Sequence, residues 1–488
     1  MITKKECTSN MIRSKSTTLF SLIAVLVAIC AYLFAQPPWS LPEKRKVDVY
    51  SKDRWFAPGE KDEAVITNES IVPYKIEISK EHVEGMYAKL RSARLINKSI
   101  LSEEEKEEDW SYGVPFSVAQ KVISYYAQEF DWKKQQEMIN TEFPQFITKI
   151  AGLDSHFVHV KAKEGLPALM LIHGWPGSFL EFRNIIPLLS PHFELIIPSL
   201  PGFGPSQAAC RPGMDTEETA ISFIELMARL DHKEFFLQGG DWGSVVAQKM
   251  ASLAPERTLG LHLNFYPGFI PLPWGPFQLA LARVSSSLVP FDDHDLAMVL
   301  KYSETISAAF AELGYYYQQS TRPDTLGYGL SDSPSGWAMW VFEKFYAWTD
   351  VSSFEELLQR FDLDQLLTNL SLYYLTGTIT TAARYYKEFM IYNIRTQSED
   401  FRRPLSPSVP VGLSDFPGEI AKNQPIAWAK LRFPGLVSVK HHSKGGHFAA
   451  MEQSEALASD IIAFVQAVQA SKVYHHHRAL PEGHERGK

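Results

Sequence analysis

A carboxylate stands at the tip of a glycine-rich turn, in the sequence GGDWG at positions 239–243. The apolar run 234–238 predicts a short buried strand before the turn, and 244–254 predicts a helix after it. A sharp strand-to-helix turn, with glycines where the backbones approach, exposes a nucleophile. Asp241 would attack an electrophilic carbon without a base, which leaves a base free to activate water against the resulting ester. The alternative is an ordinary Asp/Gly turn without chemistry.

A second turn supplies the groups that such an ester intermediate needs. The sequence HGWPG at 173–177 directly follows the apolar run 168–172, which predicts another buried strand. In this arrangement the backbone amides of Trp175 and Trp242 would form an oxyanion hole. Loss of one such donor costs about 2.7–4 kcal/mol of transition-state stabilisation. Taken alone, HGWPG is also compatible with a plain Pro/Gly turn.

A histidine near the C-terminus is the candidate base. His447 follows the last predicted core strand, at 436–440. The acid that orients it is expected in the loop after the strand predicted at 409–413, where Asp415 and Glu419 both occur. Their spacing does not choose between them. In this hypothesis the histidine activates water and the carboxylate stabilises the charged imidazole.

A parallel sheet would bring these three turns to one edge. Continuous apolar strands alternate with helices, which predicts an α/β fold with a mostly parallel sheet covered on both faces. The order nucleophile, acid, base is that of the α/β-hydrolase core. We expect an N-terminal region with a strand meander, two core segments and an inserted helical lid. Their predicted ranges are 37–165 for the linker and N-terminal region, 166–266 and 396–470 for the core, and 267–395 for the lid.

Composition excludes several classes of protein. With 488 residues, 45% hydrophobic, 21% charged and a net charge of -8, the chain is globular and has no electrostatic reason to bind nucleic acid. Cys7, Cys30 and Cys210 cannot form a disulfide framework or a zinc site. Three adjacent histidines at 475–477, in the polar tail 471–488, are weak evidence for a metal. We therefore expect no cofactor and no metal.

The N-terminus predicts a membrane anchor. After a polar tail at 1–16, the segment 17–36 carries no charge and is long enough for a helix across a hydrocarbon core of about 30 Å. Trp39 follows where interfacial aromatic residues usually lie. A cleaved signal peptide, cut between Cys30 and Ala31, is the alternative. We interpret the segment as a retained anchor because its apolar run is long.

The orientation of this anchor does not follow from the sequence. Basic residues flank the apolar segment on both sides, so the positive-inside rule gives no answer. Asn68, Asn97 and Asn369 each begin an Asn-X-Ser sequon. Glycans on them would put the body of the protein in the lumen, and their absence would favour the cytosolic face.

The combination of motifs resembles the microsomal epoxide hydrolase family, of which the insect juvenile hormone epoxide hydrolases are a branch. The resemblance runs from Val72 to Val468 and rests on DWKKQ at 131–135, HGWPGS at 173–178, PGFG at 201–204, GGDWG at 239–243 and GGHFAA at 445–450. It implies conversion of lipophilic epoxides, xenobiotic or hormonal, to vicinal diols. It also implies a single-pass anchor in the endoplasmic reticulum membrane and no cofactor.

The resemblance also assigns the catalytic residues. It implies that Asp241 is the nucleophile, which becomes an alkyl ester, and that His447 is the base. The family's acid lies in a loop of the form FPxE, which selects Glu419 over Asp415.

Two tyrosines would donate protons to the epoxide oxygen. The resemblance matches them to Tyr315 and Tyr386. Each lies in a run of tyrosines, so Tyr316 or Tyr317 could replace the first and Tyr385 the second. Phenols suit this role because they are neutral donors at pH 7.

Two rival functions remain on the same fold. A haloalkane dehalogenase also uses an Asp nucleophile followed by Trp, but it needs halide-binding donors. A non-catalytic lipid- or hormone-binding protein would not need the complete set of Asp, His and Glu. An esterase is disfavoured because no GxSxG turn precedes a helix at the expected place.

Overall fold

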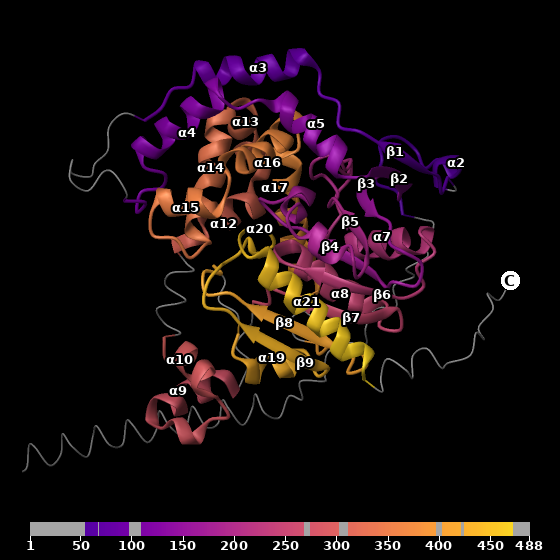
Figure 1. Cartoon of the computed structure of the whole chain (residues 1–488), viewed down its shortest axis with the longest axis vertical. Coiled ribbons are helices and arrows are strands. Elements are labelled where there is room, and N and C mark those ends of the chain that lie inside the picture. The colour runs from indigo at the N-terminus through magenta and orange to yellow at the C-terminus, as the bar shows by residue number, and fades with distance from the viewer. Residues whose placement is uncertain are drawn as a thin grey trace, which may run out of the picture. The chain divides into compact units, whose positions relative to one another are not determined.

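The computed structural model describes residues 54–66, 68–96, 109–267, 274–301, 311–396, 403–420 and 424–471. Within these residues nine strands form one sheet in the order β1-β2-β3-β5-β4-β6-β7-β8-β9 (Figure 1). The strands are β1 Ile71–Tyr74, β2 Gln145–Ile150, β3 Leu153–Val160, β4 Ala168–Ile172, β5 Glu194–Pro198, β6 Phe235–Gly239, β7 Thr258–Leu263, β8 Val411–Asp415 and β9 Leu436–His441.

The sheet has an antiparallel part and a parallel part. The pairs β1/β2, β2/β3 and β3/β5 are antiparallel, whereas every pair from β5 through β4 to β9 is parallel. All residues of β4, β6 and β7 are buried, as expected of parallel strands covered on both faces. The predicted α/β-hydrolase core with a mostly parallel sheet is confirmed.

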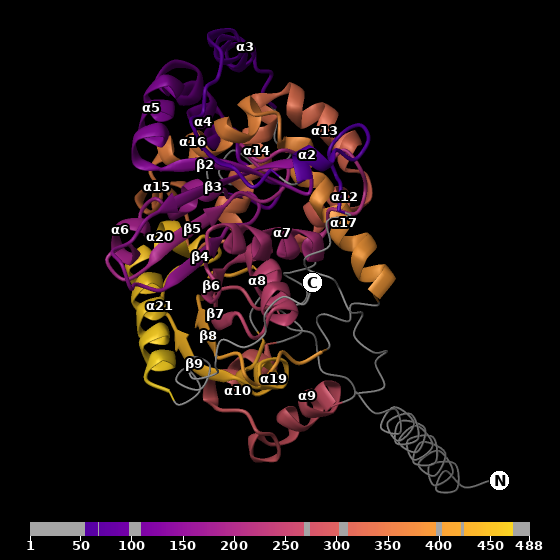
Figure 2. The same ribbon diagram turned by 90° about the vertical axis from the view of Figure 1, so that its right-hand side faces the viewer.

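Helices cover both faces of the parallel part. Helices α7 (Thr216–Arg229) and α8 (Asp241–Leu253) lie on one face, and α6 (Ile186–Leu189) and α21 (Ser454–Gln469) lie on the other (Figure 2). Asp215 begins α7, because its side chain accepts hydrogen bonds from the amides of Glu217 and Glu218 at 2.9 and 3.1 Å. The shorter helices are α2 Glu63–Ile66, η1 Phe179–Phe182, α19 Ile426–Arg432 and α20 Ala449–Glu452.

Within the described residues, six of the helices between β7 and β8 form the body of the predicted lid, and three N-terminal helices pack against it (Figure 1). The lid helices are α12 Gly314–Thr321, α13 Pro323–Asp332, α14 Pro334–Ala347, α15 Phe354–Arg360, α16 Leu363–Leu375 and α17 Ile379–Thr396. The N-terminal helices are α3 Lys80–Arg91, α4 Phe116–Gln128 and α5 Trp132–Glu142. The Tyr126 hydroxyl on α4 lies 2.8 Å from the hydroxyl of Ser371 on α16, and Tyr125 donates to Asp364. The N-terminal region therefore braces the lid.

The first part of the predicted lid range belongs to a separate compact unit. This unit holds α9 (Trp274–Val284), η2 (Ser286–Leu288) and α10 (Asp293–Leu300), together with 425–428. The Asp295 carboxylate accepts hydrogen bonds from the amides of Ile426 and Ala427 at 2.7 and 3.1 Å. The helical range 267–395 thus divides between two units.

The predicted anchor at 17–36 lies outside the described residues, as does all but the first residue of the predicted tail 471–488. Among the helices that the structure does describe, none combines the length and the apolar character needed to cross a bilayer.

One predicted glycosylation sequon is part of the core. Asn369 on α16 is 4% exposed, and its amide donates to the carbonyl oxygen of Pro176 at 2.7 Å. The Ser178 hydroxyl donates to Asn369 Oδ1 at 2.8 Å. This side chain therefore joins the lid to the turn after β4 and cannot carry a glycan in the folded protein. Asn68 is exposed, and Asn97 lies outside the described residues.

Candidate active site

The turn between β6 and α8 holds Asp241 in a strained backbone conformation. Its φ angle is +46°, in the left-handed region that residues with a side chain rarely adopt. A Cβ on Gly243 would collide with the carbonyl of Ile172 on the neighbouring strand, so only glycine fits there. Strain of about 1–3 kcal/mol at one residue is typical of functional sites.

One predicted oxyanion donor contacts this carboxylate directly. The backbone amide of Trp175 donates to Asp241 Oδ1 at 2.7 Å. Asp241 is also the first residue of α8, where the helix dipole favours negative charge. Trp242 follows it in the first turn, and its indole ring packs edge-on against Tyr386 at 4.7 Å. The role of the Trp242 amide stays a prediction.

His447 lies between two carboxylates. Its Nε2 atom is 3.4 Å from Asp241 Oδ2, and its Nδ1 atom is 2.8 Å from Glu419 Oε1. The side chains of His447 and Glu419 are 3% and 1% exposed, so water screens this contact little. Asp415, the other candidate acid, instead lies 3.1 Å from His441 Nδ1. The structure brings Glu419, and not Asp415, to the candidate base.

Backbone contacts between two loops produce this pairing. The loop after β8 contacts the loop after β9, where the Gly418 amide donates to the Gly445 carbonyl at 2.8 Å. Glu419 directly follows Gly418, and His447 lies two residues after Gly445. The His447 amide also donates to the carbonyl of Trp348 at 2.8 Å. The loop geometry therefore sets the distance between acid and base.

Sequence reasoning missed a buried acid that holds the same loop. Glu452 accepts hydrogen bonds from the amides of Gly446 and Phe448, at 2.9 and 3.2 Å. Burial raises its pKa to about 8. No motif marked it, because a single Glu in a helix after GGHF is usually an exposed residue.

The charges around His447 control its protonation. Burial favours the neutral ring, but the negative charges of Glu419 and Asp241 outweigh it and raise the pKa of His447 well above its usual range. The imidazole of His447 is therefore charged between the two carboxylates.

The two predicted tyrosines face the nucleophile from the lid. Tyr315 stacks on the ring of Trp175 at 5.2 Å, and Tyr386 packs edge-on against the same ring at 5.8 Å. The Tyr386 hydroxyl is buried and makes no hydrogen bond of ordinary geometry within the described residues. Burial, reinforced by nearby groups including Asp241, raises the pKa of both phenols well above the usual value. Both therefore remain protonated and able to donate.

The alternative tyrosines in the same two runs have different surroundings from Tyr315 and Tyr386. The Tyr385 hydroxyl donates to Thr219 Oγ1 at 3.0 Å, away from the nucleophile. Tyr317 is 51% exposed. Tyr316 packs against Tyr386 at 5.7 Å between ring centroids, so it stays near the site. Tyr385 is therefore engaged by Thr219 and Tyr317 is exposed, whereas Tyr316 is the alternative that packs against a predicted donor.

A small cavity adjoins Asp241 and has a volume of about 20 Å³. We call it the elbow cavity. Its lining includes Trp175, Glu181, Asp241, His447 and Phe448.

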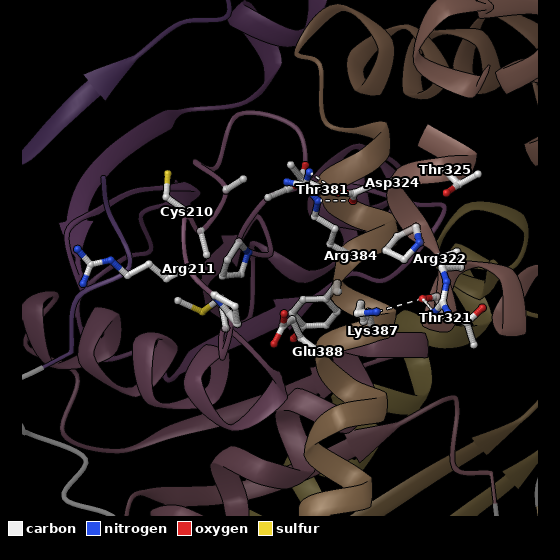
Figure 3. A pocket seen from close by; sticks show the side chains of 18 residues that line it. Cys210, Arg211, Thr321, Arg322, Asp324, Thr325, Thr381, Arg384, Lys387 and Glu388 are labelled. Carbon is white, nitrogen blue, oxygen red and sulfur yellow. Dashed lines mark hydrogen bonds and ion pairs between the residues drawn. The ribbon is translucent and has the colours of Figure 1, made fainter. Parts of the chain in front are cut away.

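A larger cavity of about 460 Å³ lies along α17 (Figure 3). Tyr385 lines it, but none of the five predicted catalytic side chains does. Its charged groups bind one another or the backbone: Arg384 pairs with Asp324 at 2.6 Å, and Lys387 donates to the Thr321 carbonyl. This larger cavity therefore does not adjoin the candidate catalytic residues.

Comparison with known proteins agrees with this geometry. The family model described as "Epoxide hydrolase N terminus" matches residues 71–182, and that described as "alpha/beta hydrolase fold" matches 167–264. Epoxide hydrolase 1 of Oryctolagus cuniculus is 37% identical over 88% of this chain and 96% of its own length. The chain belongs to the microsomal epoxide hydrolase family. It is therefore an epoxide hydrolase.

The insect branch is nearly as similar. Juvenile hormone epoxide hydrolase 1 of Ctenocephalides felis is 33% identical over 91% of this chain and 95% of its own length. The crystal structure of the juvenile hormone epoxide hydrolase of Bombyx mori matches with a TM-score of 0.77 and 32% identity, over 86% of this chain and 99% of that one. The Aspergillus niger epoxide hydrolase structure matches with a TM-score of 0.67 and 26% identity, over 82% and 97%.

Replacing the acid should change both the rate and the protonation of the base. We expect Glu419→Gln to lower turnover by about 10²–10⁴-fold, since the charged imidazole loses its partner. The pKa of His447 should fall, because a negative charge that raises it is gone. The neutral ring then persists to lower pH, so the acid limb of the ester-hydrolysis rate moves to lower pH. NMR titration of the ring and single-turnover rates measure the two effects.

Asp415→Asn is the matched control and should leave both quantities near the wild type. A larger loss of turnover in Asp415→Asn than in Glu419→Gln would contradict the assignment of the acid.

Proposed function

We propose that this epoxide hydrolase opens lipophilic epoxides through a covalent ester on Asp241, which water activated by His447 then hydrolyses. The observation that carries the proposal is the position of the Asp241 carboxylate, 2.7 Å from the Trp175 amide and 3.4 Å from His447 Nε2. A nucleophile, an oxyanion donor and a base thus lie within reach of one carbon atom.

In the first step one oxygen of Asp241 attacks an epoxide carbon and the ring C–O bond breaks. The ring oxygen gains negative charge as the bond breaks, and a proton from Tyr315 or Tyr386 neutralises it. Two protonated phenols in an apolar wall suit this role, and such general-acid assistance contributes about 10²–10⁴-fold.

In the second step water attacks the carboxyl carbon of Asp241. His447 takes a proton from this water, and the oxyanion binds the Trp175 amide, with Trp242 as the second proposed donor. Collapse of the intermediate breaks the C–O bond to the alcohol, and the imidazolium protonates the leaving alkoxide, which releases the diol. The second water proton, left on the Asp241 carboxyl group, passes to the phenolate formed in the first step and regenerates both the carboxylate and the tyrosine.

The charge of Asp241 also determines when His447 can act as a base. In the resting enzyme the charges of Glu419 and Asp241 hold the pKa of His447 high. Ester formation removes the charge of Asp241, so this pKa falls and the neutral ring becomes available. The base is thereby activated only once there is an ester to hydrolyse.

Apolar surroundings favour an apolar substrate. Aromatic rings of Trp175, Tyr315, Trp348 and Tyr386 pack against one another beside the nucleophile. Lipophilic epoxides, whether xenobiotic or terpenoid like a juvenile hormone, match this wall. Turnover on styrene-like, fatty-acid and terpenoid epoxides distinguishes the substrate classes.

The covalent mechanism makes a direct prediction about oxygen atoms. In one turnover in heavy-oxygen water, the first diol should carry an unlabelled oxygen from Asp241, because the carboxylate, and not water, attacks the ring. Asp241→Ala should form no diol while remaining folded, as judged by circular dichroism. Label in that first diol, or diol formation by the variant near the wild-type rate, contradicts the mechanism.

Removing both proton donors should affect only the first step. We expect Tyr315→Phe with Tyr386→Phe to slow ester formation by about 10²–10⁴-fold, with much less effect on ester hydrolysis. Rapid-mixing measurements with enzyme in excess separate the two rates. Tyr317→Phe, at an exposed position, is the matched control. If hydrolysis alone slows in the double variant, the donors are wrongly identified.

We further propose a single-pass anchor at 17–36 in the endoplasmic reticulum membrane. Its support is the uncharged apolar run, and an anchor suits substrates that concentrate in bilayers. The full chain should remain with membranes after an alkaline wash, and a chain lacking 1–36 should be released. Release of the full chain by that wash contradicts the anchor.

A further inference from the structure

A second carboxyl group faces the nucleophile and has no role so far. Glu181 lies in η1, four residues after Gly177. A Cβ on Gly177 would collide with Glu181 Oε2, so the glycine makes room for this carboxyl group. Glu181 lines the elbow cavity together with Asp241 and His447. The acid therefore shares the small space in which ester hydrolysis takes place.

The carboxyl group of Glu181 makes no hydrogen bond to any residue that the structure describes. Its side chain is half-buried and lines the elbow cavity. A buried polar group without a partner is costly, and water usually supplies the partner that the protein does not. The cavity offers about 20 Å³, and one water needs about 10–15 Å³ by this measure.

We propose that Glu181 holds the hydrolytic water together with His447 and aims it at the ester carbon of Asp241. The inference rests on the covalent mechanism proposed above and adds a residue to its second step. Glu181 touches the reacting water, and His447 takes the proton.

The surroundings of Glu181 suit this division of roles. Burial, with a smaller contribution from Asp241, raises the pKa of Glu181 well above its usual range, although His447 opposes the shift. A protonated acid offers one O–H donor and a carbonyl oxygen that accepts. A neutral group also adds no second negative charge beside the oxyanion of the intermediate.

The step balances with these groups. One water proton goes to His447 Nε2 and the other stays hydrogen-bonded to the carbonyl oxygen of Glu181. The water oxygen bonds to the carboxyl carbon of Asp241, and the C–O bond to the alcohol breaks. The imidazolium then returns its proton to the leaving alkoxide. The second water proton remains on the regenerated Asp241 carboxyl group and passes to the phenolate left by the first step, so Glu181 neither gains nor loses a proton.

The test separates the two chemical steps in the whole protein. With enzyme in excess, indole fluorescence of Trp175 and Trp242 beside Asp241 follows the ester, and intact-protein mass spectrometry identifies it. We expect Glu181→Leu to slow ester hydrolysis by about 100-fold, within the range seen when one polar group at a reacting oxygen is lost. Ester formation should change by less than about threefold, so the ester should accumulate.

Glu181→Gln keeps a carbonyl oxygen and a donor, so both of its rates should lie much closer to wild type. Glu142→Gln is the control, since Glu142 forms an exposed pair with Arg183 near η1. A purely structural role for Glu181 would slow both steps together. Equal slowing of both steps in Glu181→Leu, or unchanged hydrolysis, overturns the proposal.

If Glu181→Leu does not fold, Glu181→Met carries the same test with a flexible apolar side chain of similar length. Failure of the underlying mechanism has a different signature. If wild-type enzyme forms no ester adduct, the covalent mechanism and the role of Glu181 both fall. If the adduct forms and Glu181→Leu hydrolyses it at the normal rate, only the role of Glu181 falls.

Discussion

The negative charge of Asp241 is the quantity on which the rest of the site depends. The Trp175 amide and the start of α8 stabilise it, and its field helps to keep His447 charged and Glu181 neutral. Esterification would cancel this charge. One covalent event can then change the protonation of the base and leave the geometry of the site intact.

Much of the core could be predicted because its constraints are local. Buried parallel strands are continuous apolar runs, and the close approach at Gly243 leaves room for glycine alone. These signals located Asp241 and His447 at turns after strands. The acid could not be chosen from spacing, since Asp415 and Glu419 are only four residues apart. The contact between Gly418 and Gly445 decides which carboxylate reaches the base, and such a contact leaves no trace in sequence.

The lid was harder to predict for a geometric reason. Successive residues on α17 point about 100° apart, so Tyr385 bonds to Thr219 while Tyr386 faces the nucleophile. A run of tyrosines hides that difference, and the family resemblance supplied the choice. Helical periodicity also cannot show where one compact unit ends. The sequence therefore predicts one lid at 267–395, whereas the structure divides this range between two units. Glu181 went unnoticed because a lone acid in a turn has no pattern.

The burial of Asn369 bears on which side of the membrane the body of the protein can fold. Its amide nitrogen is bonded to the carbonyl of Pro176, and a sugar on that nitrogen would remove the bond. Oligosaccharide transfer acts on nascent, unfolded polypeptide. A ribosome delivering this body into the secretory lumen would expose the tripeptide before α16 docks. In the lumen, glycosylation of Asn369 would compete with the docking of α16. If the body stays on the cytosolic side of the membrane, Asn369 never meets the glycosylation machinery.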